Sequence, residues 1–413
     1  MFVKPPHFLR ALSSPNYRRY LTGQCLSLMG NWMTVTASLW LVFQLSGDPW
    51  QVGLVGFAGQ IPVLIFAPFA GVWIDRRDPL KIVRMTQVFA MLQSTALAAL
   101  TLSGHLTVPR LIALCFVQGL INALDWPARQ TLNHPLAGDP SLLDNVIALN
   151  SITFSAARLV GPAVAGFIIA GFGAGWCYAF DALSYVGVLI ALAGVRLAPH
   201  VIRPNLAHPL TDLREGVRYA MRHPALRRIL IMVPVIGLVG FAHSILAPVF
   251  AERNYHGDAR TLGFLMSATG IGALAAGLRL SLRASSAGLD RMITFGALLG
   301  GASLVGIAFA PSFVWALPCF AGAGAGGMLV MVSSNMLLQA TVDHDKRGRV
   351  MSLFSMGQSF YPVGCLLTGA VASAFGAPVA VAVSGTICLA AAIGFGRSQA
   401  AVASAAATSA GRI

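Results

Sequence analysis

The residues most able to do chemistry in this sequence are the few ionisable side chains that interrupt long apolar stretches. They are Asp125, Arg158, Asp181 and His243, and Arg158 stands in the apolar segment SAARLVGPAVAGF. In a membrane-spanning helix, a guanidinium about twelve residues from the helix start lies roughly 18 Å deep. Insertion of an unpaired arginine there costs at least about 2.5–3.5 kcal/mol. Arg158 must therefore face water, a carboxylate or an anionic ligand.

The sequence offers two embedded carboxylates as partners for this arginine. We expect Arg158 to pair with Asp125 or Asp181, and one of these carboxylates to carry a proton, because a substrate that competes for the arginine would release the acid to protonate. The alternative is a permanent ion pair that holds the helices together. His243 has a side chain that titrates near neutral pH, although a lone histidine in an apolar stretch also fits a neutral hydrogen-bonding role.

Polar side chains recur at steps of three and four residues along several of these stretches, which places them on one face of a helix. The stripes are Gln24, Ser27, Asn31, Thr34 and Ser38; then Gln118, Asn122, Asp125 and Arg129; then Ser151, Ser155 and Arg158. Such faces either line a cavity or pack against other helices. We favour a cavity, with substrate contacts from Gln24, Asn31, Gln118, Asn122, Arg158, His243 and Gln358.

The elements that must position these residues are membrane-spanning helices. Of the 413 residues, 56% are hydrophobic and only 10% are charged, and the mean hydropathy is +0.73. Only helices or a closed barrel can span lipid, and the apolar runs have helical length. We predict twelve spans, at residues 21–45, 51–73, 82–103, 110–131, 147–172, 175–195, 229–250, 261–282, 292–310, 313–339, 350–375 and 377–395.

The positions of lysine and arginine predict how these spans are oriented. With the N-terminus in the cytosol, 24 of the 28 basic residues fall on the inner side and three on the outer side, while Arg158 remains inside the membrane. This bias predicts that both termini are cytosolic. The net charge of +14 is then a girdle that faces anionic lipid, so we expect the bilayer, and no nucleic acid, as a partner.

The chain divides into two halves of six predicted spans. Phe154 and Pro162 in span five match Phe354 and Pro362 in span eleven, each two hundred positions further along, as a duplication requires. We predict an N-terminal bundle at residues 1–197, a cytosolic linker at 198–228, a C-terminal bundle at 229–396 and a disordered tail at 397–413. The linker segment PLTDLREGVRYAM has the pattern of an amphipathic helix in the headgroup region, or else of an ordinary solvated helix.

The pair Gly161-Pro162 has a predicted mechanical role. Proline removes a backbone hydrogen bond and kinks a helix, while the glycine lets a neighbouring helix approach closely. This combination suits a joint along which two bundles rock, and simple close packing is the alternative.

Several motifs resemble the major facilitator superfamily. The segment GVWIDRRDPLK, residues 71–81, is similar to the superfamily's inner-loop motif, although its second half is degenerate. In CFVQGL, Cys115 occupies the place of the motif's arginine, so a proton-transfer role for that arginine does not carry over. ARLVGPAVAG resembles the span-five motif of drug–proton antiporters.

A narrower resemblance covers most of the chain. SPNYRRYLTGQCLSLMGNWM, ALDWPARQ, IALNSITFSAARLVGPAVAG and DKRGRVMSLFSMG resemble the branch that contains the bacterial enterobactin exporter and macrolide efflux proteins. The resemblance implies a monomer of two pseudo-symmetric bundles that exports a small amphiphile across the bacterial inner membrane by proton antiport. It also implies a cytosolic gate around Asp75, and in the alternative to proton carrying Asp125 and Arg129 belong to this gate. The expected gating residues are Asp75, Arg76, Arg129, Gly161, Pro162, Arg347 and Arg349.

The sequence argues against other classes of function. None of its three lysines follows a glycine as a phosphate-binding loop requires, and no serine stands with a spaced histidine and acid, so we expect no enzyme, cofactor or metal. The six cysteines lie in apolar stretches and are expected to be free thiols. A lipid or lysophospholipid flippase and a sensor that no longer transports are the alternatives on the same scaffold.

Overall fold

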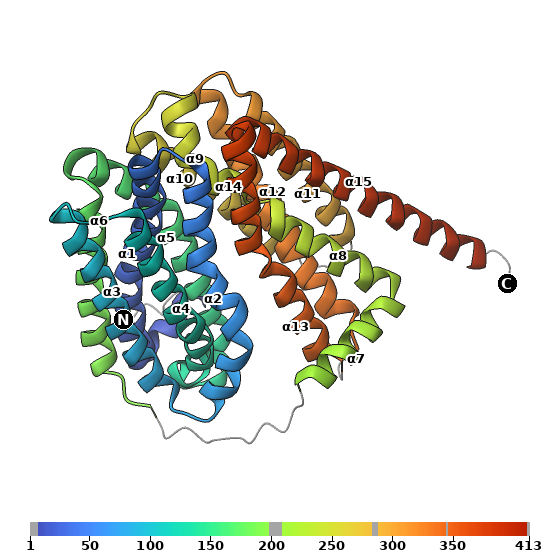
Figure 1. The fold of residues 1–413 in the computed structure, drawn as a ribbon. Helices are drawn as coiled ribbons and strands as arrows, with labels where there is room; N and C mark the ends of the chain where they lie inside the picture. The colour runs from blue at the N-terminus through green and yellow to red at the C-terminus, as the bar shows by residue number, and fades with distance from the viewer. Residues whose placement is uncertain (1–6, 198–208, 283–287, 344–345, 411–413) are drawn as a thin grey trace. The chain divides into compact units, whose positions relative to one another are not determined.

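The fold is described from a computed structural model that covers residues 7–197, 209–282, 288–343 and 346–410. This part of the chain is helical and contains no strand (Figure 1). Its helices are α1 (Pro15–Ser46), α2 (Pro49–Asp75), α3 (Pro79–Leu102), α4 (Val108–Ala137), α5 (Leu143–Phe172), α6 (Ala174–Ala193), α7 (Pro209–Arg222), α8 (Pro224–Val239), α9 (Ala242–Val249), α10 (Ala259–Ser281), α11 (Leu289–Phe309), α12 (Phe313–Thr341), α13 (Arg347–Gln358), α14 (Tyr361–Phe375) and α15 (Ala377–Ala410). The short turns are η1 (His7–Ser13), η2 (Pro140–Leu142) and the π-helical η3 (Phe250–Asn254).

Twelve segments of the described residues are long and apolar enough to cross a membrane. Each overlaps one of the twelve predicted spans, so the predicted all-helical membrane fold is confirmed. Span seven comprises α8, α9 and η3, and span eleven comprises α13 and α14. In span seven the apolar composition continues across the break, whereas in span eleven the polar residues Gln358 and Ser359 and the following Pro362 stand at the break.

The helix ends follow from local sequence. Ser14 caps α1 by accepting a hydrogen bond from the Tyr17 amide, and Gly47 ends the helix in the left-handed region at φ 64°. Asp78 caps α3 by accepting from the Leu80 amide at 2.9 Å, with Pro79 in the first turn. Asp78 and Pro79, at which the inner-loop motif departs from its family pattern, therefore start helix α3.

Helix α15 extends to Ala410, and the disordered tail expected from residue 397 stays a prediction. The segment from Gln399 to Ala410 is rich in alanine, the residue with the highest helix propensity, which accounts for its helical backbone. The boundaries predicted for the bundles and the linker stay predictions.

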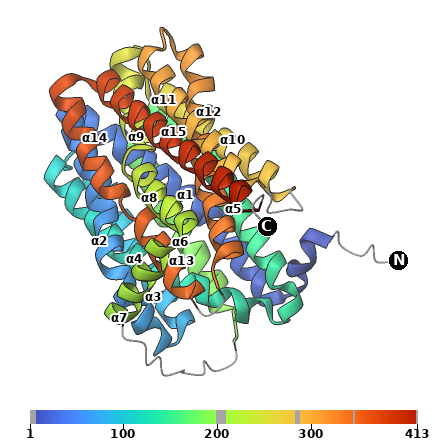
Figure 2. The same ribbon diagram turned by 90° about the vertical axis from the view of Figure 1, so that its right-hand side faces the viewer.

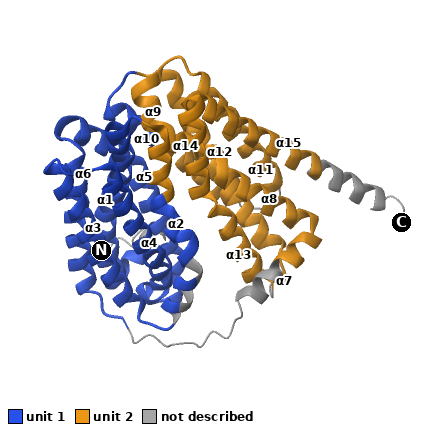
Figure 3. Ribbon diagram, viewed as in Figure 1, with its two compact units in different colours: residues 1–47, 58–206, 256–267 blue, residues 48–57, 207–255, 268–413 orange. Residues whose placement is uncertain are grey.

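The chain forms two compact units (Figure 3). Unit 1 contains residues 1–47, 58–206 and 256–267, and unit 2 contains residues 48–57, 207–255 and 268–413. The start of α10 therefore belongs to unit 1, where Gly263 packs on α5 so closely that a Cβ would meet the carbonyl of Pro162. Likewise the start of α2 belongs to unit 2, where Gly53 packs against Gly369 of α14. Glycine allows both close approaches.

Each unit has its own packed core. In unit 1, α1 packs against α5 and α6, and α3 packs against α4 and α6; Tyr17, Leu132 and Leu192 lie in its largest apolar cluster. In unit 2, α11 packs against α12 and α15, with Gly296 against Gly326 and Gly301 against Gly385. These contacts hold the helices that carry the candidate site residues.

Candidate functional site

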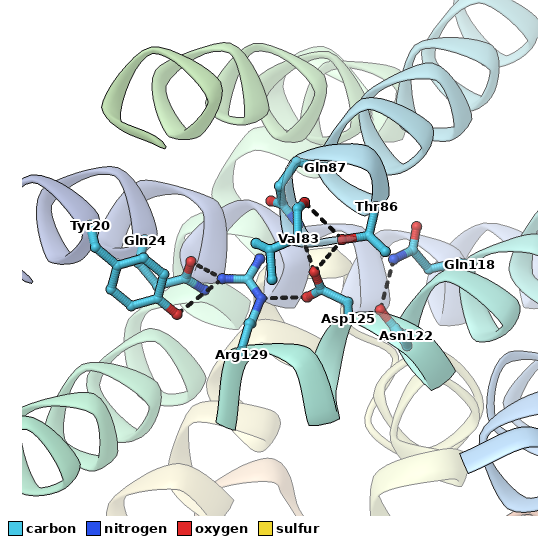
Figure 4. A network of polar contacts seen from close by, with 9 residues as sticks. All are labelled: Tyr20, Gln24, Val83, Thr86, Gln87, Gln118, Asn122, Asp125 and Arg129. Atoms are coloured by element: carbon cyan, nitrogen blue, oxygen red, sulfur yellow. Dashed lines mark hydrogen bonds and ion pairs between the residues drawn. The ribbon is translucent and has the colours of Figure 1, made fainter. Parts of the chain in front are cut away.

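The most extensive polar network among the described residues lies in unit 1, where Arg129 and Asp125 form an ion pair on α4 (Figure 4). The two residues stand one turn apart, and their side chains are only 13% and 14% exposed. The second oxygen of Asp125 accepts hydrogen bonds from Thr86 Oγ1 at 2.6 Å and Gln87 Nε2 at 3.0 Å, both on α3. Because both oxygens have donors, the carboxylate is well satisfied as an anion.

The other end of Arg129 reaches α1. Its Nη1 donates to Gln24 Oε1 and, at 3.4 Å, to the hydroxyl of Tyr20. A guanidinium has five N–H donors and can hold several acceptors at once. Arg129 and Asp125 together therefore join α1, α3 and α4 of unit 1.

Two further residues that we predicted as substrate contacts, Gln118 and Asn122, also lie on α4. Gln118 Nε2 donates to Asn122 Oδ1 at 3.0 Å, one turn apart. Figure 4 shows this pair on the side of Asp125 away from Tyr20. The Gln118 Oε1 atom is buried and has no hydrogen-bond partner among the described residues, so it is available to a polar group that enters here.

Asp181 of α6 occupies a different environment. Its side chain is 1% exposed, and its Oδ2 accepts hydrogen bonds from Thr34 of α1 at 2.9 Å and Ser94 of α3 at 2.8 Å. Oδ1 is buried without a hydrogen-bond partner among the described residues and lies against Gly30, where a Cβ would collide with it. Both donors are neutral, so no positive charge offsets an ionised Asp181.

The bonds described for the two carboxylates come from other residues, and the ion pair expected for Arg158 stays a prediction. Asp125 pairs with Arg129. The Oδ2 atom of Asp181 accepts its hydrogen bonds from two hydroxyl groups. Arg129 is four residues from Asp125 on the same helix and needs no tertiary contact to reach it. The guanidinium of Arg158 lies 5.7 Å from the ring centroid of Trp32, within cation–π distance.

Trp32 belongs to an aromatic cluster that was not predicted. Phe154 of α5 makes edge-to-face contacts with Trp32 of α1, at 5.9 Å between centroids, and with Trp126 of α4, at 6.0 Å. Trp126 is 56% exposed although it lies in the middle of an apolar span. The sequence contained part of this arrangement. Phe154 precedes Arg158 by one helical turn on α5, and Trp126 follows Asn122 by one turn on α4.

Other predicted residues of unit 1 have clear positions. Asn31 is half-buried and lies near Tyr185, which is 4% exposed. Gly161 is buried against α1, where a Cβ would meet Trp32, and Pro162 remains inside an unbroken α5. These positions fit close packing of α1 and α5, while a role in rocking stays a prediction.

Residues predicted for the cytosolic gate are only partly placed. The side chain of Asp75 lies outside the described residues, and Arg76 is exposed. In unit 2, Arg347 is exposed and Arg349 bonds Glu215 of α7 at 2.5 Å. The structure thus connects Arg349 to the linker helix.

The two predicted substrate residues of unit 2 differ in accessibility. His243 is 1% exposed, with its ring edge-to-face with Phe320 at 5.5 Å and its Nε2 3.2 Å from the Ser244 hydroxyl. Gln358 is exposed and is the last residue of α13, where span eleven breaks. Their roles in binding substrate stay predictions.

Comparisons with known proteins place this arrangement in a family. A family described as "Transmembrane secretion effector" matches residues 9–411. The chain is 25% identical to the staphyloferrin A transporter of Staphylococcus aureus, over 90% of this chain and 93% of that one. It is 23% identical to macrolide efflux protein A of Streptococcus pyogenes, over 89% and 92% of the two chains. It is 24% identical to the enterobactin exporter of Shigella flexneri, over 83% and 81%.

Solved structures share the fold at low sequence identity. The nucleoside transporter NupG superposes with a TM-score of 0.74 at 12% identity, over 93% of this chain and 99% of that one. A bacterial homologue of the iron transporter ferroportin superposes with a TM-score of 0.65 at 16% identity, over 91% and 98%. The fold is thus that of the major facilitator transporters. The chain belongs to the transmembrane secretion effector family of the major facilitator superfamily and is a multi-pass transporter of the bacterial inner membrane, not an enzyme.

Proposed function

We propose that this protein exports a small amphiphilic compound across the inner membrane by proton antiport, through alternating access of its two halves. Curated relatives include exporters and efflux proteins for a siderophore, drugs and macrolides. The substrate is neutral or anionic in this proposal, and the carboxylate of Asp125 is already neutralised by Arg129. The termini are cytosolic, and the protein works as a monomer.

The proposal of proton coupling rests on one observation. The negative charges of the two embedded carboxylates of unit 1 are offset to different degrees by their neighbours. Asp125 has a guanidinium and two further donors, whereas Asp181 has only two hydroxyl donors on one oxygen. A buried carboxylate without a counter-charge is costly, and a proton removes that cost. Of the two carboxylates proposed for coupling, Asp181 is therefore the proton carrier, and Asp125 is a fixed part of the bundle.

The substrate contacts in this proposal come from the exposed part of unit 1 around Arg158. Trp126, Phe154 and Trp32 provide apolar ring surface beside the guanidinium, and Gln118 with Asn122 provides polar groups on α4. Gln24 and Asn31 position neighbouring side chains in this account. Gln358 and His243 are the contacts proposed from unit 2.

Transport by everted membrane vesicles tests this function directly. The vesicles are energised to an acidic interior and offered enterobactin, staphyloferrin A or a macrolide, and uptake is compared with vesicles that lack the protein. We expect uptake of at least one compound that stops when a protonophore dissipates the pH gradient. Uptake that persists without the gradient would contradict antiport, and flux of a lysophospholipid with none of the three compounds would favour the flippase.

A further inference from the structure

The linker helix α7 is attached to unit 2 at the point where the chain turns into the membrane. It ends at Arg222, and the membrane-spanning α8 begins at Pro224, with only His223 between them. Helix α7 packs against α8 and α13, and Figures 1 and 2 show α7 beside α13 from both directions. Its place in the chain therefore keeps α7 at the membrane boundary.

One face of α7 is bonded to the neighbouring helices of unit 2. Glu215 accepts a hydrogen bond from Arg349 of α13 at 2.5 Å, and the Tyr219 hydroxyl donates to Asp343, which follows α12, at 2.9 Å. Ala220 is 2% exposed. Because Glu215 and Tyr219 are one turn apart, they fix the rotation of the helix about its axis.

The opposite face of α7 is exposed and has an unusual composition. Val217 and Met221 are 44% and 53% exposed on this face. Arg218 and Arg222, which follow them in sequence, lie between this face and the side of Glu215 and are also exposed. Neither arginine is bonded to an acidic side chain within the described part of the chain. Two like charges one turn apart repel each other on a helix.

The composition of this face matches the surface of an anionic bilayer. An apolar stripe with flanking arginines is the pattern of a helix that lies at the headgroup level, with its apolar side chains toward the acyl chains. Anionic lipids attract such arginines and relieve their mutual repulsion. The next arginines along the chain, Arg227 and Arg228, lie in the first turns of α8 and extend the positive charge toward the membrane.

We propose that α7 is a sensor of anionic lipid that acts on span eleven. Val217 and Met221 insert at the headgroup level, and Arg218 with Arg222 binds lipid phosphate. The bond between Glu215 and Arg349 transmits this docking to α13, whose far end at Gln358 is the break in span eleven. Anionic lipid thus stabilises α13 and sets how readily span eleven bends.

Hydrogen–deuterium exchange of the full-length protein in nanodiscs tests this proposal without any transported substrate. Discs of phosphatidylcholine are compared with discs that also contain phosphatidylglycerol. We expect the anionic lipid to slow exchange in α7 and in α13. In the variant R218Q/R222Q the lipid effect on both helices disappears, because each arginine contributes about a factor of five to affinity for an anionic surface.

Two further variants identify the route of the effect. E215Q keeps the lipid effect on α7 and loses it on α13. R279Q/R291Q removes the same charge from two exposed arginines elsewhere in unit 2 and retains both effects. The proposal is overturned if phosphatidylglycerol leaves exchange in α7 unchanged, if R279Q/R291Q loses the effect as fully as R218Q/R222Q, or if α13 never responds. Equal unfolding temperatures of the variants exclude misfolding as the cause.

Discussion

Spans five and eleven carry the same sequence pattern and form different structures. In unit 1, α5 runs unbroken through Pro162, whereas in unit 2 the matching Pro362 follows a break at Ser359 and Phe360. Arg158 stands four residues before the first proline and Gln358 four residues before the second. Among the described residues, the embedded charges Asp125, Arg158 and Asp181 therefore lie in unit 1, and the interrupted spans seven and eleven lie in unit 2.

The hydrogen bonds near each proline differ between the two spans. Neither Pro162 nor Pro362 has an amide to bond the carbonyl four residues before it. In α5 the next carbonyl, that of Leu159, accepts an additional bond from Ser267 Oγ at 2.7 Å. In span eleven, Ser359 Oγ instead bonds back to the Ser355 carbonyl at 2.9 Å, a contact that bends helices. A repeated proline therefore permits a break without requiring one.

The largest effect should come from disrupting the charged network that distinguishes unit 1. R129Q leaves Asp125 buried beside two neutral donors, and loss of one partner from a buried ion pair costs about 3–5 kcal/mol. We expect a marked fall in unfolding temperature in detergent. R76Q, which changes an exposed arginine, serves as the control and should have no effect. If D125N/R129Q is no more stable than R129Q, an uncompensated charge is not the cause.

The second prediction exchanges the two prolines for alanine. P362A restores an amide to span eleven and should join α13 and α14, with slower hydrogen exchange at residues 359–364 and slower transport. A proline inside a helix costs about 3 kcal/mol relative to alanine, so the joined helix should be more stable. P162A alters a helix that is already continuous and should slow transport less than P362A does. Equal transport by the two variants would mean that the break in span eleven has no function.

Close packing of α5 on α1 gives a third prediction of smaller size. G161L forces a side chain against Trp32, and overpacking of this kind costs about 1–3 kcal/mol. We expect normal expression, a lower unfolding temperature and lost transport. The matched variant G171L adds the same side chain to the same helix where nothing lies within 4 Å of the new Cβ. Transport that is retained in G161L would reduce Gly161 to a packing residue.

The smallest effect is expected at the aromatic cluster beside Arg158. W126A removes an edge-to-face contact worth about 0.5–1.5 kcal/mol and should raise the substrate concentration for half-maximal transport by several-fold, with the maximal rate little changed. Trp176 of α6 is exposed to a similar degree, at 54% against 56%, and W176A is the control. Equal effects of the two substitutions would argue against substrate contact at Trp126.

The fold could be predicted from sequence much more fully than the site. Apolar runs of spanning length indicated all twelve spans, because hydropathy is a local property of the chain. The spacing of Asp125 and Arg129 placed both on one helix face, yet their pairing was missed in favour of Arg158. The bonds that Asp181 receives depend on how three helices are rotated against one another, and no pattern within a single helix reports that rotation. The break in span seven was missed because apolar composition continues through it, whereas Pro362 at the break in span eleven has a counterpart, Pro162, in a helix that does not break.

The central claim is that Asp181 carries the coupled proton while Asp125 does not, and two assays on one variant test it. In proteoliposomes, D181N should retain exchange of labelled for unlabelled substrate without a gradient, since the substrate contacts remain. It should lose uptake driven by an imposed pH gradient, because asparagine cannot bind and release a proton. If D181N shows gradient-driven uptake at the native rate, the assignment of Asp181 and the contrast drawn between the two carboxylates are contradicted.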